Sequence, residues 1–511
     1  MAYLADGRSW RLLRDRRLPR LPRHGQRRRG RARVSARGRR RRPDRTRGTA
    51  VTHVAILGGG PAGLAAAQGA LAAGARVSLL DEGDRLGGQF WRHHERLTDP
   101  RLQHGWHRFE RLRDALARGD ARVHVGASVW SAEATDLGVR LRAVVGAADA
   151  DARTAVDVEA DAVVVATGAH DLALPVPGWT LPGVTTAGAA QALAKRDGVA
   201  VGRRTVVSGA GPFLLPVAQS LALVGSDVVG VLEASRITAL AAGWLPRPWE
   251  LAGKAGEFLQ YAGGLARHRI PYRTGSGVVR VLGDERVEGV VVAALDADWH
   301  PIVGTEREVA CDAVALGHGF APRLEAALAL GCDLRGDHRG RFVVVDDAQR
   351  TTTAQVFAAG EVTGIAGADA ALAEGAVAGF LAAGGALGDP RLRGPVTARR
   401  RARAFARRLE RAHGIRPGWT AWVDDATIVC RCEAVTRRAI AERADVPLRA
   451  MRLATRAGLG PCQGRTCGRA VEAIVAEAGG APASVGFDRR PVLAPVRIGE
   501  VAALAATDPA T

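Results

Sequence analysis

Two stretches of the chain alternate short apolar runs with helical patterns, and both begin alike. In the first, the run Val54 to Leu57 is followed by a glycine-rich turn, an Ala- and Leu-rich helical segment and a second apolar run, RVSLL. Further along, TVVSGAG is followed by the helical pattern FLLPVAQSLALVG and the run DVVGVLEA. Such alternation predicts parallel sheets in an α/β fold. Residues 316–385 return to the first pattern, so we expect two Rossmann-like units, the second inserted in the first.

The pattern divides the chain into seven parts, with a small helical module after the α/β body. The linker that precedes this module is predicted to be a helix whose arginines face solvent. The expected parts are an Arg-rich tail at 1–50, one dinucleotide-binding domain at 51–170 and 316–385, a second such domain at 171–315, the basic linker at 386–425, the cysteine-containing module at 426–485 and an extended tail at 486–511.

The first glycine-rich turn has the spacing of a dinucleotide-binding site. Gly58 allows a tight turn, Gly60 lets the backbone approach a pyrophosphate, and Gly63 lets helix and strand pack closely. Free N–H groups at the start of the following helix then face the phosphates. The second strand ends at Asp81, where an acid is expected to bond ribose hydroxyls, with Glu82 as the alternative.

The second glycine-rich turn departs from this pattern. Gly209 and Gly211 occupy the first two glycine positions, and Leu214 replaces the third. The acid, Glu233, lies one residue beyond the expected place. We expect the same fold here, with three alternatives for its ligand: NAD(P), another adenine nucleotide, or none.

Positive charge is concentrated at the N-terminus. The formal net charge is +20, and residues 1–50 contribute 19 Arg and 3 Asp, whereas the rest of the chain has 53 basic and 49 acidic residues. The tail has no apolar period with which to form a core. We interpret it as a wrongly extended start, with translation beginning near Val51. A basic arm for nucleic acid or anionic surfaces is the alternative, and we expect no nucleic-acid partner.

Composition also disfavours several classes of protein. No run approaches the ~18 apolar residues of a membrane-spanning helix, and the six cysteines lack the spacing of a secreted disulfide framework. We therefore expect a cytoplasmic protein, with peripheral contact at the inner membrane face as an alternative. Cys311 and Cys332 lie among apolar residues and no CxxC pair exists, which disfavours a disulfide reductase.

The other four cysteines form two close pairs, Cys430 with Cys432 and Cys462 with Cys467. Helical patterns lie between and after these pairs, so the sulfurs are expected at loop ends. Four thiolates suit zinc or an iron–sulfur cluster, and Cys-x-Cys is tighter than the spacing usual for structural zinc. The residues alone favour a cluster and leave zinc, a disulfide and free thiols open.

The first glycine-rich segment, with GDRLGGQF, DAVVVATGA and VFAAGEVTG, resembles the two-dinucleotide-binding-domain flavoprotein family. The resemblance implies FAD at the first turn, with the GGQ segment and the ATG turn near the flavin and an acid at the ribityl chain. His170 and His318 are predicted to lie near the flavin in structural roles. The cofactor-binding residues that the resemblance adds are Gly87, Gly88, Gln89, Gly168, Gly360 and Glu361.

The pattern CRCE…PCQGRTC resembles the 2Fe–2S module of bacterioferritin-associated ferredoxin. With an FAD body and the stretch PGWTLPGVTTAGAAQ, it is similar to the flavoprotein subunits of hydrogen cyanide synthase and opine oxidase and to the large subunit of sarcosine oxidase. The resemblance implies a 2Fe–2S cluster on the four paired cysteines. It also implies two partners: a D-amino-acid-oxidase-like flavoprotein subunit and, in addition, a small ferredoxin-like subunit.

The expected function is that of an FAD-dependent oxidoreductase. It would transfer electrons within a hetero-oligomeric amino-acid, opine or amine dehydrogenase, because a flavin can take two electrons and a neighbouring cluster can receive them singly. One alternative is a self-sufficient NAD(P)H-dependent reductase that passes electrons through its cluster. The other is a redox-silent iron–sulfur or nucleotide-binding scaffold.

Overall fold

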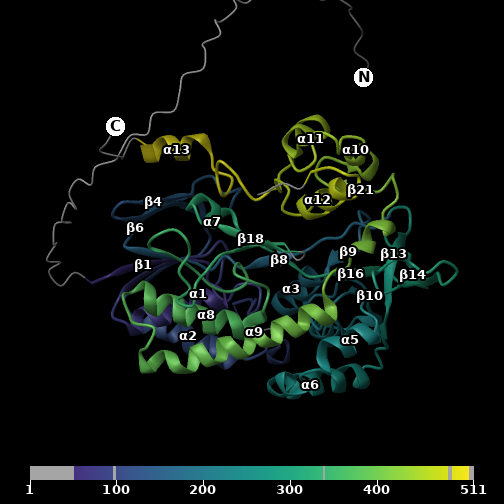
Figure 1. Cartoon of the computed structure of the whole chain (residues 1–511), viewed down its shortest axis with the longest axis horizontal. Coiled ribbons are helices and arrows are strands. Elements are labelled where there is room, and N and C mark those ends of the chain that lie inside the picture. The colour runs from purple at the N-terminus through teal and green to yellow at the C-terminus, as the bar shows by residue number, and fades with distance from the viewer. Residues whose placement is uncertain (1–50, 96–98, 338–339, 482–485, 506–511) are drawn as a thin grey trace, which may run out of the picture. The chain divides into compact units, whose positions relative to one another are not determined.

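The structure, a computed structural model, describes residues 51–95, 99–337, 340–481 and 486–505 (Figure 1). By its internal contacts the chain divides into two units, Met1–Ala50 and Val51–Thr511. The predicted Arg-rich tail lies outside the described residues. The fold and the site below belong to the second unit.

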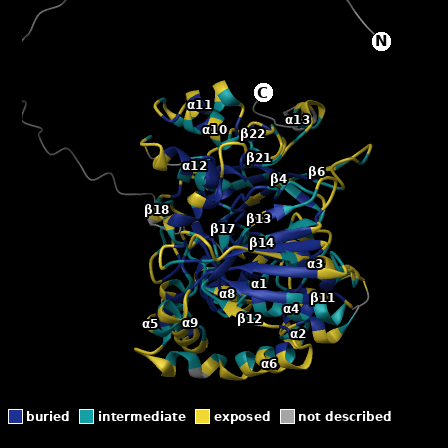
Figure 2. Ribbon diagram, turned by 90° about the vertical axis from the view of Figure 1, so that its right-hand side faces the viewer, coloured by how far each residue is buried: buried dark blue, intermediate teal, exposed yellow. Residues whose placement is uncertain are grey.

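The first sheet has five parallel strands in the order β20-β7-β1-β2-β3. Its centre is β1, in which Leu57 lies opposite Leu80 of β2 and Val165 of β7. Strands β1, β2 and β7 are short, apolar and buried. Figure 2 shows the buried strands of the interior in dark blue. The strands are β1 (His53–Leu57), β2 (Arg76–Leu80), β3 (Ala121–His124), β7 (Ala162–Val165) and β20 (Val356–Ala358).

The second sheet also has five parallel strands, in the order β12-β11-β10-β16-β9. All of them lie between β7 and β20 in sequence, so the second unit is inserted in the first and the predicted fold class is confirmed. The strands are β9 (Val184–Thr186), β10 (Arg204–Gly209), β11 (Asp227–Glu233), β12 (Tyr272–Thr274) and β16 (Ala313–Gly317). The helices of this part are α3 (Ala187–Asp197), α4 (Leu214–Leu223), α5 (Ile237–Trp244) and α6 (Ala255–Arg267).

Small antiparallel sheets complete the two domains. The sheet β4-β5-β6 packs on the first sheet, and the sheet β13-β14-β15 packs on the second. The short strands β8 and β17 pair where the chain passes from the first domain to the second and back. The strands are β4 (Ala127–Thr135), β5 (Gly138–Val145), β6 (Thr154–Ala160), β8 (Ala169–Asp171), β13 (Ser276–Leu282), β14 (Gly289–Ala294), β15 (Arg307–Ala310), β17 (Phe320–Pro322), β18 (Leu334–Asp337) and β19 (Gly340–Val343).

Helices α1 (Pro61–Ala72) and α8 (Gly367–Ala382) lie side by side beneath the first sheet (Figure 1). Pro61 suits the first position of α1 because its missing N–H has no helical partner there. Both helices carry small apolar side chains on most sides, as expected of helices buried between a sheet and another helix. Their backbones approach so closely that a Cβ at Gly379 would lie 1.8 Å from the Ala66 carbonyl oxygen.

The basic linker forms α9 (Arg393–His413), which confirms the predicted helix but not its solvated face. Several arginines of α9 turn inward, and Arg399 is only 3% exposed. Arg399 donates to the Asp347 carbonyl at 2.7 Å, and Arg403 donates to the Glu374 carboxylate at 2.8 Å. The helix is thus anchored to α8 by the Arg403–Glu374 ion pair and to the segment at Asp347 by Arg399, contacts that a charge count cannot reveal. Helix α2 (Trp106–Arg118) packs nearby.

The C-terminal module is mainly helical, as predicted, and Thr436 caps α10 through the Ala439 N–H. Its apolar residues belong to the same core as the inner face of the second domain. The expectation of an extended tail after 486 is wrong in part, because Ile498–Ala505 forms helix α13. The elements are α7 (Glu325–Ala329) of the body, and β21 (Ile428–Cys430), β22 (Val435–Thr436), α10 (Arg437–Ala441), α11 (Leu448–Thr455) and α12 (Gly468–Glu477) of the module.

Substitution of Gly379 by Ala is expected to lower the free energy of unfolding by about 1–3 kcal/mol, because the added methyl forces α8 away from α1. The matched control is Gly263→Ala in α6, where nothing lies within 4 Å of the new Cβ. That control should be neutral or stabilising by about 0.5–1 kcal/mol. Urea unfolding of both variants checks this, and equal stabilities would show that the helices can separate at no cost.

Candidate functional site

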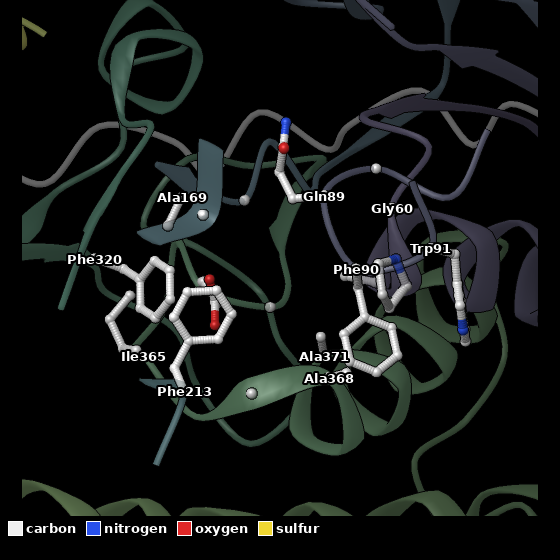
Figure 3. A pocket seen from close by; sticks show the side chains of 18 of the residues that line it. Gly60, Gln89, Phe90, Trp91, Ala169, Phe213, Phe320, Ile365, Ala368 and Ala371 are labelled. Carbon is white, nitrogen blue, oxygen red and sulfur yellow. The ribbon is translucent and has the colours of Figure 1, made fainter. Parts of the chain in front are cut away.

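One cavity of about 2200 Å³ joins the two domains of the second unit and reaches the cysteine module. It is lined by the first glycine-rich turn, the second turn and residue Cys462. Figure 3 shows Phe213 and Phe320 on one side, with ring centroids 5.1 Å apart, and Phe90 and Trp91 on the other. A ligand pocket of ordinary size is about 300–1,000 Å³, so this cavity has room for more than one ligand.

The first glycine-rich turn has the backbone that a dinucleotide site needs. Gly58 adopts a φ of +105°, and a Cβ there would lie 2.3 Å from the Ala166 carbonyl oxygen. A Cβ at Gly63 would lie 1.7 Å from the Gly58 carbonyl oxygen, so only glycine fits at this position in the first turn of α1. Gly58 and Gly60 line the cavity, whereas Gly63 lies behind them in the packing.

The acid at the end of β2 is Asp81, and its carboxylate turns toward the glycine-rich turn. It accepts hydrogen bonds from the N–H groups of Gly59 and Gly83. Burial raises the pKa of Asp81, which those two N–H groups oppose. Glu82 is exposed and pairs with Arg323 at 2.6 Å. Asp81 is therefore the acid held at the turn, and its contact with ribose hydroxyls stays a prediction.

The Gly-Gly-Gln segment packs directly on this turn. The Gly87 N–H donates to the Gly59 carbonyl at 2.8 Å, and a Cβ at Gly88 would lie 2.9 Å from Cα of Gly60. Gln89 lines the cavity and is labelled in Figure 3. Gly168, the glycine of the Ala-Thr-Gly turn, lines it as well. Segments far apart in sequence thus meet at the first turn, while Gly87 is set back from the cavity.

The turn after β20 brings Gly360 and Glu361 to the same cavity. The Gly367 N–H, at the start of α8, donates to the Glu361 carboxylate, and burial raises the pKa of that group to about 7. Beneath the turn, the buried Glu374 accepts from the Gly360 N–H at 3.0 Å. Arg403 of α9 bonds Glu374 in turn.

Sequence reasoning missed the Glu374–Arg403 pair that supports this turn. Glu374 is one of two acids in the Ala- and Gly-rich helix α8 and lies among its apolar residues, and that position was the available signal. Its partner could not be read, because Arg403 is one of many arginines in α9.

The second glycine-rich turn is closed by its own acid. Glu233 is fully buried and accepts from the Gly211 N–H at 2.8 Å, the Ser235 N–H at 2.9 Å and His413 Nδ1 at 3.2 Å. Burial opposes ionisation, but these donors, the His413 ring above all, hold the pKa of Glu233 below its usual value. A Cβ at Gly209 would lie 1.8 Å from the Gly317 carbonyl oxygen, so this glycine serves packing. The Glu233 carboxylate is thus enclosed by protein donors, one of them the His413 ring.

The two predicted histidines both line the cavity. His170 donates from Nε2 to the Arg465 carbonyl at 2.8 Å, since a carbonyl can only accept. His318 packs beside Trp299 and Trp422 without a hydrogen-bond partner at either ring nitrogen among the described residues. Burial lowers the pKa of His318 to about 4, so its ring is neutral.

The four paired cysteines come together as two pairs across the module. The Cys467 thiol donates to Cys430, which together with the Gly458 N–H at 3.4 Å lowers the pKa of Cys430 to about 5. Cys432 pairs with Cys462, whose pKa is lowered by main-chain N–H groups despite burial. No group of three or more His, Cys, Asp or Glu side chains within the described ranges is gathered around one metal position.

The Cys462–Cys467 loop is fixed to the first domain. His170 bonds the Arg465 carbonyl, and the Arg465 side chain bonds Glu325 at 2.9 Å and the Leu493 carbonyl at 2.9 Å. Cys462 itself lines the cavity, whereas the other three cysteines of the module do not. The module thus presents one of its cysteines to the same space as the first glycine-rich turn.

Comparison with known proteins agrees with this architecture. Residues 52–375 match the pyridine nucleotide-disulphide oxidoreductase family. The chain is 36% identical over 482 residues to an opine oxidase subunit from Rhizobium meliloti, covering 88% of this chain and 87% of that one. It is 32% identical over 438 residues to the hydrogen cyanide synthase subunit HcnB of Pseudomonas aeruginosa, covering 81% and 90%. The crystal structure of L-proline dehydrogenase from P. horikoshii aligns with a TM-score of 0.59 at 21% identity, covering 88% and 79%.

The chain therefore belongs to the pyridine nucleotide-disulphide oxidoreductase family. Within it, the chain is an FAD-dependent oxidoreductase similar to subunits of multi-subunit oxidases and synthases, which confirms the predicted resemblance to these flavoprotein subunits. The predicted resemblance of the cysteine module to a 2Fe–2S ferredoxin stays a prediction. None of the helices within the described ranges is long and apolar enough to cross a membrane.

The raised pKa of Glu361 predicts a pH-dependent stability for the cofactor-free protein. Its pKa is 4.5 when unfolded and about 7 when folded. Between these values the folded state holds more protons, so stability falls as pH rises from about 4.5 to 7 and then levels off, by about 1–3 kcal/mol in total. Denaturant unfolding across this window tests it: the slope should be absent from Glu361→Gln, and an unchanged slope would assign it to other groups.

Proposed function

We propose that this chain is the electron-transferring flavoprotein subunit of a hetero-oligomeric amino-acid, opine or amine dehydrogenase, with FAD in the first domain and a 2Fe–2S cluster in the module. The observation that carries the proposal is the shared cavity: Gly60 and Cys462 line the same space. The relatives named as subunits of opine oxidase and hydrogen cyanide synthase support the hetero-oligomer.

The residues at the first turn suit FAD. The N-terminus of α1 behind Gly58 and Gly60 offers free N–H groups to a diphosphate, and Asp81 offers a carboxylate beside them. The turn at Gly360 and Glu361 and the start of α8 would face the ribityl side, held by Glu374 and Arg403 beneath. FAD, when bound, supplies the exchange of electron pairs with substrate and of single electrons with an acceptor.

The cysteine pairs suit a two-iron cluster better than zinc. In a 2Fe–2S cluster each iron takes two thiolates, which matches the pairs Cys430–Cys467 and Cys432–Cys462. A structural zinc ion gathers four ligands at one point, whereas the sulfurs of this module make pairwise contacts. The N–H groups that stabilise Cys430 and Cys462 as thiolates would also tune the potential of a bound cluster.

The self-sufficient NAD(P)H reductase is the weaker alternative. Such an enzyme needs the acid of the second turn to be free for ribose hydroxyls, and Glu233 is already bonded to His413 and two N–H groups. We therefore favour reduction by a partner subunit, which we propose to be D-amino-acid-oxidase-like, over reduction by a nicotinamide nucleotide.

The cluster is tested by changing its ligands. Anaerobically prepared protein should contain iron and show flavin bands with a broad visible shoulder, and Cys430→Ser should lose both the iron and the shoulder while keeping the flavin bands. Cys311→Ser is the control, since Cys311 is buried in the second domain, outside the module. Zinc in place of iron, or a shoulder that survives Cys430→Ser, would contradict the proposal.

The source of electrons is tested by co-expression with the neighbouring open reading frame. The flavin of the complex should bleach with an amino acid or opine, scored with glycine, sarcosine, proline and opines. The isolated chain should not bleach with NADH or NADPH. Rapid bleaching by either nucleotide would support the reductase alternative, and a flavin that no donor reduces would support the redox-silent scaffold.

A further inference from the structure

Lysine occurs only twice in this Arg-rich chain, at Lys195 and Lys254, and both residues line the cavity. Every other side-chain cation except histidine is Arg. Lysine differs from arginine in being a compact point charge that gives up its proton readily when buried. The two lysines are therefore placed where that difference matters.

The surroundings of the two lysines differ sharply. Lys254 pairs with Glu257 at 2.7 Å and Asp369 at 2.8 Å, so its charge is neutralised. Lys195, on α3, is only 6% exposed, and its one hydrogen-bond partner in the described part of the chain is the Phe90 carbonyl. Its ammonium also lies 5.5 Å from the Phe90 ring centroid. Two of its three N–H donors are thus unused.

A second cation stands beside Lys195 without a counter-ion. Arg92 also lines the cavity, and its guanidinium makes no ion pair or hydrogen bond with the residues that the structure describes. The nearby carboxylates have other partners: Asp84 and Asp197 pair with Arg196 at 3.1 and 3.6 Å, and Asp81 accepts from the N–H groups of Gly59 and Gly83. Burial, with the repulsion of Arg92 added to it, lowers the pKa of Lys195 to about 8. A buried positive charge is costly unless it is paired.

We propose that Lys195 and Arg92 form an anion site in the cavity wall that binds a carboxylate or phosphate group of a ligand. Two sources fit this chemistry: the carboxylate of a small amino-acid-like substrate, and the diphosphate of the dinucleotide. Phe90 follows the Gly-Gly-Gln segment, and Figure 3 places it at the cavity across from Phe213 and Phe320. The carboxylate source rests on the proposed function, whereas the site itself does not.

The experiment measures binding and not turnover, so failure of the proposed function leaves it interpretable. FAD is titrated into cofactor-free wild type, Lys195→Met, Arg92→Met and the control Lys254→Met, with flavin fluorescence as the signal. The FAD-loaded proteins are then titrated with acetate, glycine and phosphate, with the flavin absorption band as the signal.

Lys195→Met and Arg92→Met should each weaken one of these two affinities about tenfold, since a hydrogen bond to a charged group contributes about 1.5–3 kcal/mol. Loss of FAD affinity identifies the diphosphate as the bound anion. Loss of acetate, glycine or phosphate affinity at unchanged FAD affinity identifies a free anion site. Lys254→Met should change neither by more than about twofold, because its charge is already paired.

Thermal unfolding of the cofactor-free proteins gives an independent measurement. In buffer without such anions, Lys195→Met should raise the midpoint, because an unpaired buried charge is replaced by an apolar side chain. Added phosphate should raise the midpoint of the wild type and leave that of Lys195→Met unchanged. The proposal would be overturned if Lys195→Met bound FAD and the anions as tightly as the wild type. It would also be overturned if Lys254→Met lost as much affinity as Lys195→Met.

Discussion

The backbone contact between α1 and α8 is the constraint on which the site depends. These helices belong to the two halves of the first domain, which the second domain separates in sequence. Their glycines remove the side chains between them, so Gly375 and Gly379 lie against the carbonyls of Ala62 and Ala66. That contact sets the turn at Gly360 beside the start of α1, so it brings the two halves of the proposed FAD site together.

The two nucleotide-type units share a contact between an acid and the glycine-rich turn, but the acid is exposed to a different degree in each. In each, the acid at the end of the second strand accepts a hydrogen bond from an N–H group of its glycine-rich turn: Asp81 from Gly59, and Glu233 from Gly211. Asp81 stays partly exposed at the cavity, whereas Glu233 is sealed by His413 from α9. Similar local sequences thus give one turn whose acid faces a ligand space and one whose acid is committed to the protein.

The local sequence pattern predicted much of this structure, but it could not predict contacts between residues far apart along the chain. The second strand of the first unit was predicted at RVSLL and is observed at Arg76–Leu80, because strand, turn and helix follow one another within a short segment. The inward arginines of α9, the helix at Ile498–Ala505 and the Lys195–Phe90 contact were not predicted. Each depends on a partner far along the chain, and in α9 the abundance of arginine conceals which ones are buried.

The apolar core shared by the second domain and the module has a consequence for how the protein matures. Cys430 and Cys467 lie in one continuous core with Trp179 and Ile474. Whatever ties those two sulfurs together therefore also braces the second domain. If the proposed 2Fe–2S cluster is what ties them, a cell short of iron would hold less folded protein as well as less active protein, so iron supply and protein abundance would be linked.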